Sequence, residues 1–73
     1  MNTNAVMIDA NISDLFFNSD LEATRRLDRD GNFLGYDDEA LRAEAECFLA
    51  YLARLGVSVP SVDDLVADFY ARV

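Results

Sequence analysis

Four oxygen-bearing side chains are spaced within twelve residues in a way that suits the ligands of a metal ion. Residues 28–39 read DRDGNFLGYDDE, with an acid or an amide at every second position at the start. Carboxylate and amide oxygens are the ligands that calcium prefers in proteins. A calcium site is therefore one interpretation of this stretch, with four candidate ligands: Asp28, Asp30, Asn32 and Glu39.

This stretch resembles the twelve-residue loop of the EF-hand family, in a degenerate single copy. The four candidate ligands stand at its first, third, fifth and twelfth positions, which in that family supply oxygen ligands, the last one bidentate. The sixth position needs glycine at positive φ but is Phe33 here, and a bulky residue in that conformation costs about 1–2 kcal/mol. The eighth, normally aliphatic, is Gly35, and no second loop exists to pair with it. These departures favour an interpretation without a metal.

The competing interpretation is a β-hairpin over residues 25–36. Its sequence DG is typical of a two-residue turn in which both central residues have positive φ. Counting outward from that turn pairs Leu27 with Leu34 and Arg25 with Tyr36, which is a sensible half-buried surface. The hairpin is the favoured prediction, and an irregular turn remains a further alternative.

Catalytic chemistry has few possible residues in this chain, which contains neither histidine nor lysine. Neither a nucleophile elbow nor a glycine-rich phosphate loop is present. Cys47 is the only cysteine, and the carboxylates of Glu44 and Glu46 beside it disfavour a thiolate, so packing is its expected role. Acids at 37–39 suit the start of a helix better than a magnesium site. We therefore expect no enzyme, no cofactor and no metal.

The charge of the chain predicts a basic protein as the partner. Fourteen acids and six arginines give a net charge of −8, and such a field repels nucleic acids and anionic membranes. The only basic cluster, Arg25, Arg26 and Arg29, is expected to pair with nearby acids, so direct nucleic-acid binding is not predicted. Because the single cysteine cannot form an intrachain disulfide and no signal peptide or membrane span is recognisable, a cytoplasmic location is expected.

The apolar pattern of the C-terminal half predicts two helices, at about 38–55 and 62–72. In the first, apolar residues recur at steps of four and three, and Gly56 follows as a C-cap. In the second, Ser61 stands at the N-cap position. The predicted apolar positions are Leu41, Ala45, Phe48, Leu49, Leu52 and Leu55 in the first helix and Val62, Leu65, Val66, Phe69, Tyr70 and Val73 in the second.

The N-terminal part predicts a short helix. Asn4 is a candidate cap, although the same run also suits the start of a strand. Ser19 and Glu22 have the spacing of a further capping box, which leaves a helix over residues 20–27 as the alternative to the first strand of the hairpin. The apolar positions of the N-terminal helix are Ala5, Ile8, Ile12, Leu15 and Phe16.

These elements predict a predominantly α-helical protein with a short β-hairpin, a small α+β fold in a single domain over residues 1–73. With 52% apolar residues the chain has enough material for one core. On the helix surfaces Arg42 is expected to pair with Glu39 and Glu46, and Asp68 with Arg72.

The favoured hypothesis for function is a non-catalytic inhibitor that presents fixed carboxylates to a cationic surface. In size and charge the chain resembles the small acidic inhibitors of phages and mobile elements, among them anti-CRISPR proteins and other DNA mimics, and this resemblance implies a nucleic-acid-handling complex of host defence as the target. Acids one helical turn apart are separated by about 6 Å, the scale of phosphate spacing. The expected contact residues are Asp37, Asp38, Glu39, Glu46, Asp63, Asp64 and Asp68.

A hypothesis of another class is a structural or regulatory module that self-associates, for instance as a homodimer, or docks a partner helix. Ala40, Ala43, Ala50 and Ala53 leave the central helix small or apolar nearly all round. Helices that are covered on more than one side have this pattern.

Overall fold

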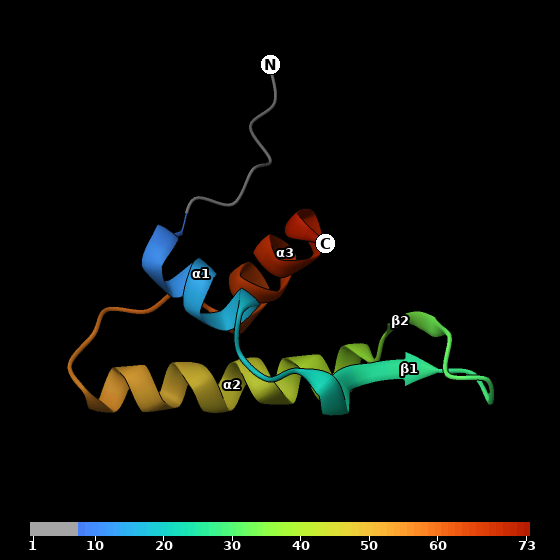
Figure 1. Cartoon of the computed structure of the whole chain (residues 1–73). Helices are drawn as coiled ribbons and strands as arrows, with labels where there is room; N and C mark the ends of the chain where they lie inside the picture. The colour runs from blue at the N-terminus through green and yellow to red at the C-terminus, as the bar shows by residue number, and fades with distance from the viewer. Residues whose placement is uncertain (1–7) are drawn as a thin grey trace, which may run out of the picture.

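The computed structural model describes residues 8–73 and confirms the predicted fold class (Figure 1). Helix α1 (Ala10–Phe17) is followed by a 3-10 turn η1 (Glu22–Thr24) and by a hairpin of β1 (Arg25–Leu27) and β2 (Phe33–Tyr36). Two longer helices complete the described part, α2 (Asp38–Arg54) and α3 (Val62–Arg72).

Helix α1 and helix α3 lie together on one side of α2, and the hairpin extends past the N-terminal end of α2 (Figure 1). In residues 8–73 no helix has the length and hydropathy that crossing a bilayer requires.

The core lies where the three helices meet the 3-10 turn. The Phe16 ring contacts the rings of Phe48 and Phe69 with centroids 5.4 and 5.7 Å apart, which joins all three helices. Aromatic pairs at this separation add to the stability that burial of their apolar area provides. The buried apolar side chains are Ile12, Phe16, Leu21, Leu41, Ala45, Leu49, Leu52, Leu65, Val66 and Phe69.

Four residues predicted to face the core are exposed. Leu15, Leu55 and Val73 are 58%, 61% and 59% accessible to solvent, and Tyr70 is 39% accessible. Leu55 and Val73 are the C-cap residues of α2 and α3, and each lies beyond the last buried side chain of its helix. Periodicity identified the right face of each helix, but helix ends extend past their packing partners.

The caps of the two longer helices follow the sequence signals. Asp37 accepts a hydrogen bond from the amide of Ala40 at 3.1 Å, and Ser61 from the amide of Asp64 at 3.1 Å. These bonds satisfy amides that have no partner inside the helix. The starts of both helices are therefore explained by local sequence.

Gly56 ends α2, as predicted, with φ of +85°. Its amide donates to the carbonyl of Ala53 at 3.0 Å, and the amide of Val57 donates to the carbonyl of Leu52 at 3.1 Å. This pair of bonds is a Schellman motif, in which a left-handed residue favours glycine.

Helix α1 begins later than the sequence suggested. The Asp9 carboxylate caps it by accepting from the amides of Asn11 and Ile12 at 2.8 and 3.3 Å. The predicted cap Asn4 and the apolar Ala5 lie outside the described residues. The alternative helix over residues 20–27 is wrong, because only one 3-10 turn forms there before β1 begins.

The hairpin forms over the predicted range with a different register at its tip. Arg25 pairs with Tyr36, as predicted, but Leu27 pairs with Phe33 instead of Leu34. Leu34 is thus an extra residue, a β-bulge, and Gly35 beside it has φ of +120°. A bulge adds one residue to one strand only, so a count of alternating residues does not foresee it.

The turn at the tip is also longer than two residues. The amide of Gly31 donates to the carbonyl of Asp28 at 3.0 Å, and the amide of Asp28 to the carbonyl of Asn32 at 3.0 Å. Of the three residues between them only Gly31 has positive φ. This is the three-residue loop with a glycine bulge, in which Asp30 keeps an ordinary backbone conformation.

Candidate functional site

Arg42 links the N-terminal ends of α2 and α3. Its Nε lies 2.9 Å from Oδ2 of Asp38, and its Nη1 bonds to Asp63 on α3. The hydroxyl of Tyr70 donates to the other oxygen of Asp38 at 3.1 Å. The bond from Arg42 and the weaker one from Tyr70 hold the pKa of the Asp38 carboxyl below its usual value. Two of the predicted contact acids are therefore partly neutralised by the protein itself.

The predicted partners of Arg42 are wrong. Glu39 and Glu46 were expected to pair with Arg42 along α2. Arg42 instead pairs with Asp38, in the first turn of α2, and with Asp63, on α3. Glu39 and Glu46 are exposed, are seven residues apart on the same side of α2, and have no ion pair within residues 8–73.

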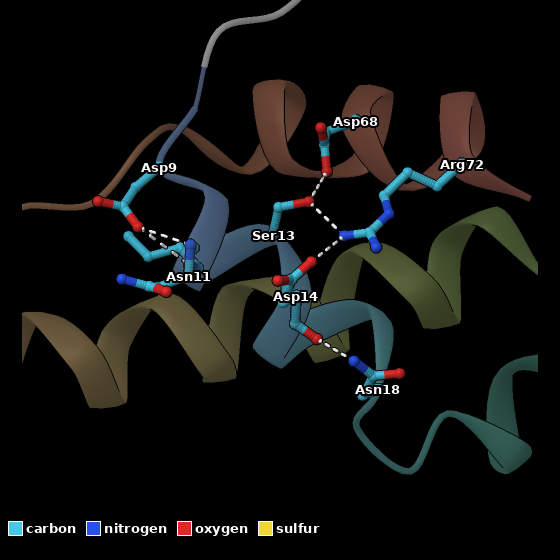
Figure 2. A network of polar contacts seen from close by, with 8 residues as sticks. Asp9, Asn11, Ser13, Asp14, Asn18, Asp68 and Arg72 are labelled. Carbon is cyan, nitrogen blue, oxygen red and sulfur yellow. Dashed lines mark hydrogen bonds and ion pairs between the residues drawn. The ribbon is translucent and has the colours of Figure 1, made fainter.

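A second polar network joins α1 to α3 (Figure 2). The buried Ser13 hydroxyl donates to Oδ2 of Asp68 and accepts from Nη1 of Arg72 at 2.8 Å. The same nitrogen lies 2.8 Å from Oδ1 of Asp14. Arg72 thus pairs with Asp14 and not, as predicted, with Asp68.

Asp68 does not belong to the outer surface of α3. It was predicted, like Asp64, to be a contact residue, but its side chain is half-buried and points to Ser13 (Figure 2). Asp64 is exposed and forms no ion pair with the described residues. Among the predicted contact acids of the helices, those without an ion pair in residues 8–73 and without a bond to another helix are Glu39, Glu46 and Asp64, here called the outer carboxylates, with the capping Asp37 beside them.

The stretch at 28–39 has the backbone of a hairpin and not that of an EF-hand loop. Phe33, at the sixth position, lies in β2, and the positive φ values fall at Gly31 and Gly35. The carboxylate of Asp28 accepts from the amides of Asp30 and Asn32, both at 2.8 Å. Glu39 is in the first turn of α2. No group of three or more acids, cysteines or histidines among residues 8–73 is arranged to hold a metal ion.

Hydrogen bonds within this loop hold the pKa of the Asp28 carboxyl below its usual value. The amide of Asn32 has the largest effect, and the Asn32 side chain, which donates to the other oxygen at 3.1 Å, has the next largest. The first candidate ligand therefore already serves as the acceptor that shapes the turn.

Two expectations for other reactive or charged side chains are corrected. Cys47 is exposed and is not packed in the core. Arg25 was expected to pair with an acid, but its guanidinium lies over the Phe33 ring, 5.0 Å from the centroid. Among the described residues Arg26 and Arg29 form no ion pair either.

A pocket that sequence analysis did not foresee lies between the end of α1, the 3-10 turn, the hairpin and α3. It has a volume of about 320 Å³. Its lining comes from four elements that only the fold brings together, so no local pattern indicates it. The lining residues are Phe17, Ser19, Asp20, Leu21, Glu22, Arg25, Phe33, Tyr36 and Phe69.

The described surface offers charge and aromatic area for binding. The outer carboxylates supply fixed negative charge, and the pocket supplies an apolar wall with two acids at its rim. Comparisons with protein-family models, curated proteins and solved structures give no match for this chain.

Proposed function

We propose that this protein is a small, acidic, non-catalytic interaction protein that binds a basic surface of another protein. The observation that supports this most directly is the excess of uncompensated carboxylates. Fourteen acids face six arginines, and within residues 8–73 ion pairs engage only Asp14, Asp38 and Asp63. Most of the negative charge therefore acts on the surroundings and attracts a cationic partner.

The outer carboxylates are the proposed contact residues, together with Asp37. They project from two helices whose ends are capped and whose inner faces are buried, so the backbone from which they project is held in place by the fold. Fixed charges bind with a smaller loss of conformational entropy than mobile ones. Asp38 and Asp63 contribute less because Arg42 offsets their charge, and Asp68 is left out because it is bonded to Ser13.

The proposed partner is a nucleic-acid-handling complex of host defence, whose cationic groove the protein would occupy in the cytoplasm in place of DNA or RNA. The support is the resemblance in size and charge to small acidic inhibitors of phages and mobile elements. Such grooves attract any fixed array of anions because phosphate contacts are largely electrostatic.

The test is competition with DNA for a purified CRISPR effector complex. We expect the protein to displace labelled DNA at about 50 mM salt and much less at about 300 mM, because salt screens charged surfaces. The variant Glu39→Lys with Glu46→Lys should weaken displacement about tenfold or more. The control, Asp30→Lys with Glu44→Lys, changes the net charge equally and should weaken it far less.

Two outcomes would count against the proposal. Equal loss in both double variants would show that net charge alone matters, and the outer carboxylates would be withdrawn as a contact site. The proposal that the protein inhibits this complex by charge mimicry would be overturned if competition were equally strong at both salt concentrations and in both double variants. It would also be overturned if no competition were observed.

Self-association is the second candidate, supported by the apolar groups on the surface. Ala43, Cys47 and Ala50 are exposed on α2, and the larger side chains of Leu27, Phe33 and Leu34 are exposed on the hairpin. Sedimentation at low and high salt separates the candidates. A dimer that persists at high salt would support self-association, and a monomer would support the acidic interaction protein.

A further inference from the structure

The pocket beside the hairpin has a continuous aromatic wall. Ring centroids of Phe17 and Phe69 are 5.6 Å apart, those of Phe69 and Tyr36 are 5.0 Å apart, and those of Tyr36 and Phe33 are 5.1 Å apart. Phe69 is buried, Phe17 and Tyr36 are half-buried, and Phe33 is exposed. The wall therefore runs from the core out to the surface.

Two of these rings already contact arginines of the chain itself. The Cζ atom of Arg72 lies 4.4 Å from the Phe17 centroid, and that of Arg25 lies 5.0 Å from the Phe33 centroid. A guanidinium within about 6 Å of a ring centroid is attracted by the negative face of the ring. The folded protein thus already places guanidinium groups over two of these rings.

The rim of the pocket carries two carboxylates without a cationic partner. Asp20 and Glu22 line it, and neither forms an ion pair within residues 8–73. One oxygen of Asp20 accepts from the amide of Glu22 at 3.1 Å, which orients the side chain. Arg25 also lines the pocket, so the three charged groups at the rim sum to a negative charge.

We infer that this pocket receives an arginine side chain from the basic partner, and this rests on the proposed function. The planar guanidinium stacks on aromatic faces and bonds carboxylates through a fixed set of donors, which suits this wall and this rim. A lysine ammonium lacks the planar surface, and an apolar anchor leaves both carboxylates unused. With about 320 Å³ the pocket holds one side chain and not a helix.

The experiment uses three short blocked peptides that differ at one position, arginine, lysine or leucine, titrated into the labelled protein and followed by amide NMR. We expect the arginine peptide to shift the amides of residues 19–22 and 33–36. It should bind several times more tightly than the lysine peptide, and the leucine peptide should bind least.

A matched pair of variants locates the binding. Asp20→Asn with Glu22→Gln removes both negative charges of the rim and keeps an acceptor at position 20, and it should weaken binding of the arginine peptide about tenfold. Asp30→Asn with Glu44→Gln removes equal charge elsewhere and should leave binding nearly unchanged. Phe33→Ala, at an exposed ring, should also weaken binding while the amide spectrum stays folded.

Several results would overturn the inference. These are equal binding of the leucine and arginine peptides, shifts confined to other residues, equal effects of the two double variants, or no shift with any peptide. Failure here is distinct from failure of the proposed function. Displacement of DNA that depends on Glu39 and Glu46, without peptide binding, would contradict the arginine pocket and leave the proposed inhibition standing. Binding of the arginine peptide without displacement of DNA would contradict the proposed inhibition and leave the pocket standing.

Discussion

At the scale of single residues, the acids within the helices have two different roles. Asp14, Asp38, Asp63 and Asp68 bond to groups on another helix and hold the helices together. The outer carboxylates have no such partner. Residue type alone did not separate these roles, because both kinds of acid occupy polar positions of amphipathic helices.

Ser13 is the residue on which the network between α1 and α3 depends. We expect Ser13→Ala to lower the free energy of unfolding by about 1–3 kcal/mol, because the half-buried Asp68 loses its donor and Arg72 loses an acceptor. Urea unfolding measures this difference. Ser58→Ala, at an exposed position, is the matched control, and equal stability of the two variants would show that the network contributes nothing.

Asp28 should make stability depend on pH in acid. Its pKa in the folded protein is lower than the ordinary value of 3.8, so folding is favoured while the carboxyl is ionised. That contribution is present above the unfolded pKa and is lost as pH falls through the folded pKa. We expect the stability difference between the wild type and Asp28→Ala to shrink as pH is lowered from about 6 to about 2.5. Parallel stability curves would contradict this.

At the scale of elements, the hairpin shows how one residue changes a predicted surface. The base keeps the pairing of Arg25 with Tyr36, and the bulge at Leu34 shifts the tip by one residue. This brings Phe33 opposite Leu27 and close to Tyr36, where it completes the aromatic wall of the pocket. The binding surface inferred here therefore depends on an irregularity of the strand.

Gly35 should be the position at which this irregularity is most sensitive. Gly35→Ala is expected to destabilise the protein by about 1–3 kcal/mol, since φ of +120° is strained for an L-residue. A Cβ there would meet nothing within 4 Å, so the cost is backbone strain alone. D-alanine, introduced by chemical synthesis, favours positive φ and should restore stability. Equal loss with both alanines would exclude the backbone explanation.

At the scale of the whole molecule, the charge of −8 opposes folding. Repulsion among uncompensated acids is stronger in the compact state than in the extended chain. In the part of the chain that the structure describes, three ion pairs offset only a little of it.

Added salt should therefore raise the thermal stability of the isolated protein. We expect Tm to rise by a few degrees between about 10 and 300 mM NaCl, because screening weakens repulsion more than it weakens the few ion pairs. Circular dichroism at each concentration measures it. A variant with Glu39, Glu44 and Glu46 changed to Gln should have a higher Tm than the wild type at low salt, and its Tm should depend less on the salt concentration. A Tm that falls with salt would show that the ion pairs outweigh the repulsion.

The sequence by itself determined α2 and α3, their caps and the presence of the hairpin, because these depend on residues a few positions apart. Asp37, Ser61 and Gly56 act through their own neighbours, and helical spacing in α2 and α3 selects the buried face. The tertiary structure alone decided which acids are free and where the pocket lies. Arg42 binds an acid twenty-one positions away and Arg72 one fifty-eight away, while the pocket joins four elements. Such contacts depend on how helices cross and where a strand bulges, and no local pattern records either.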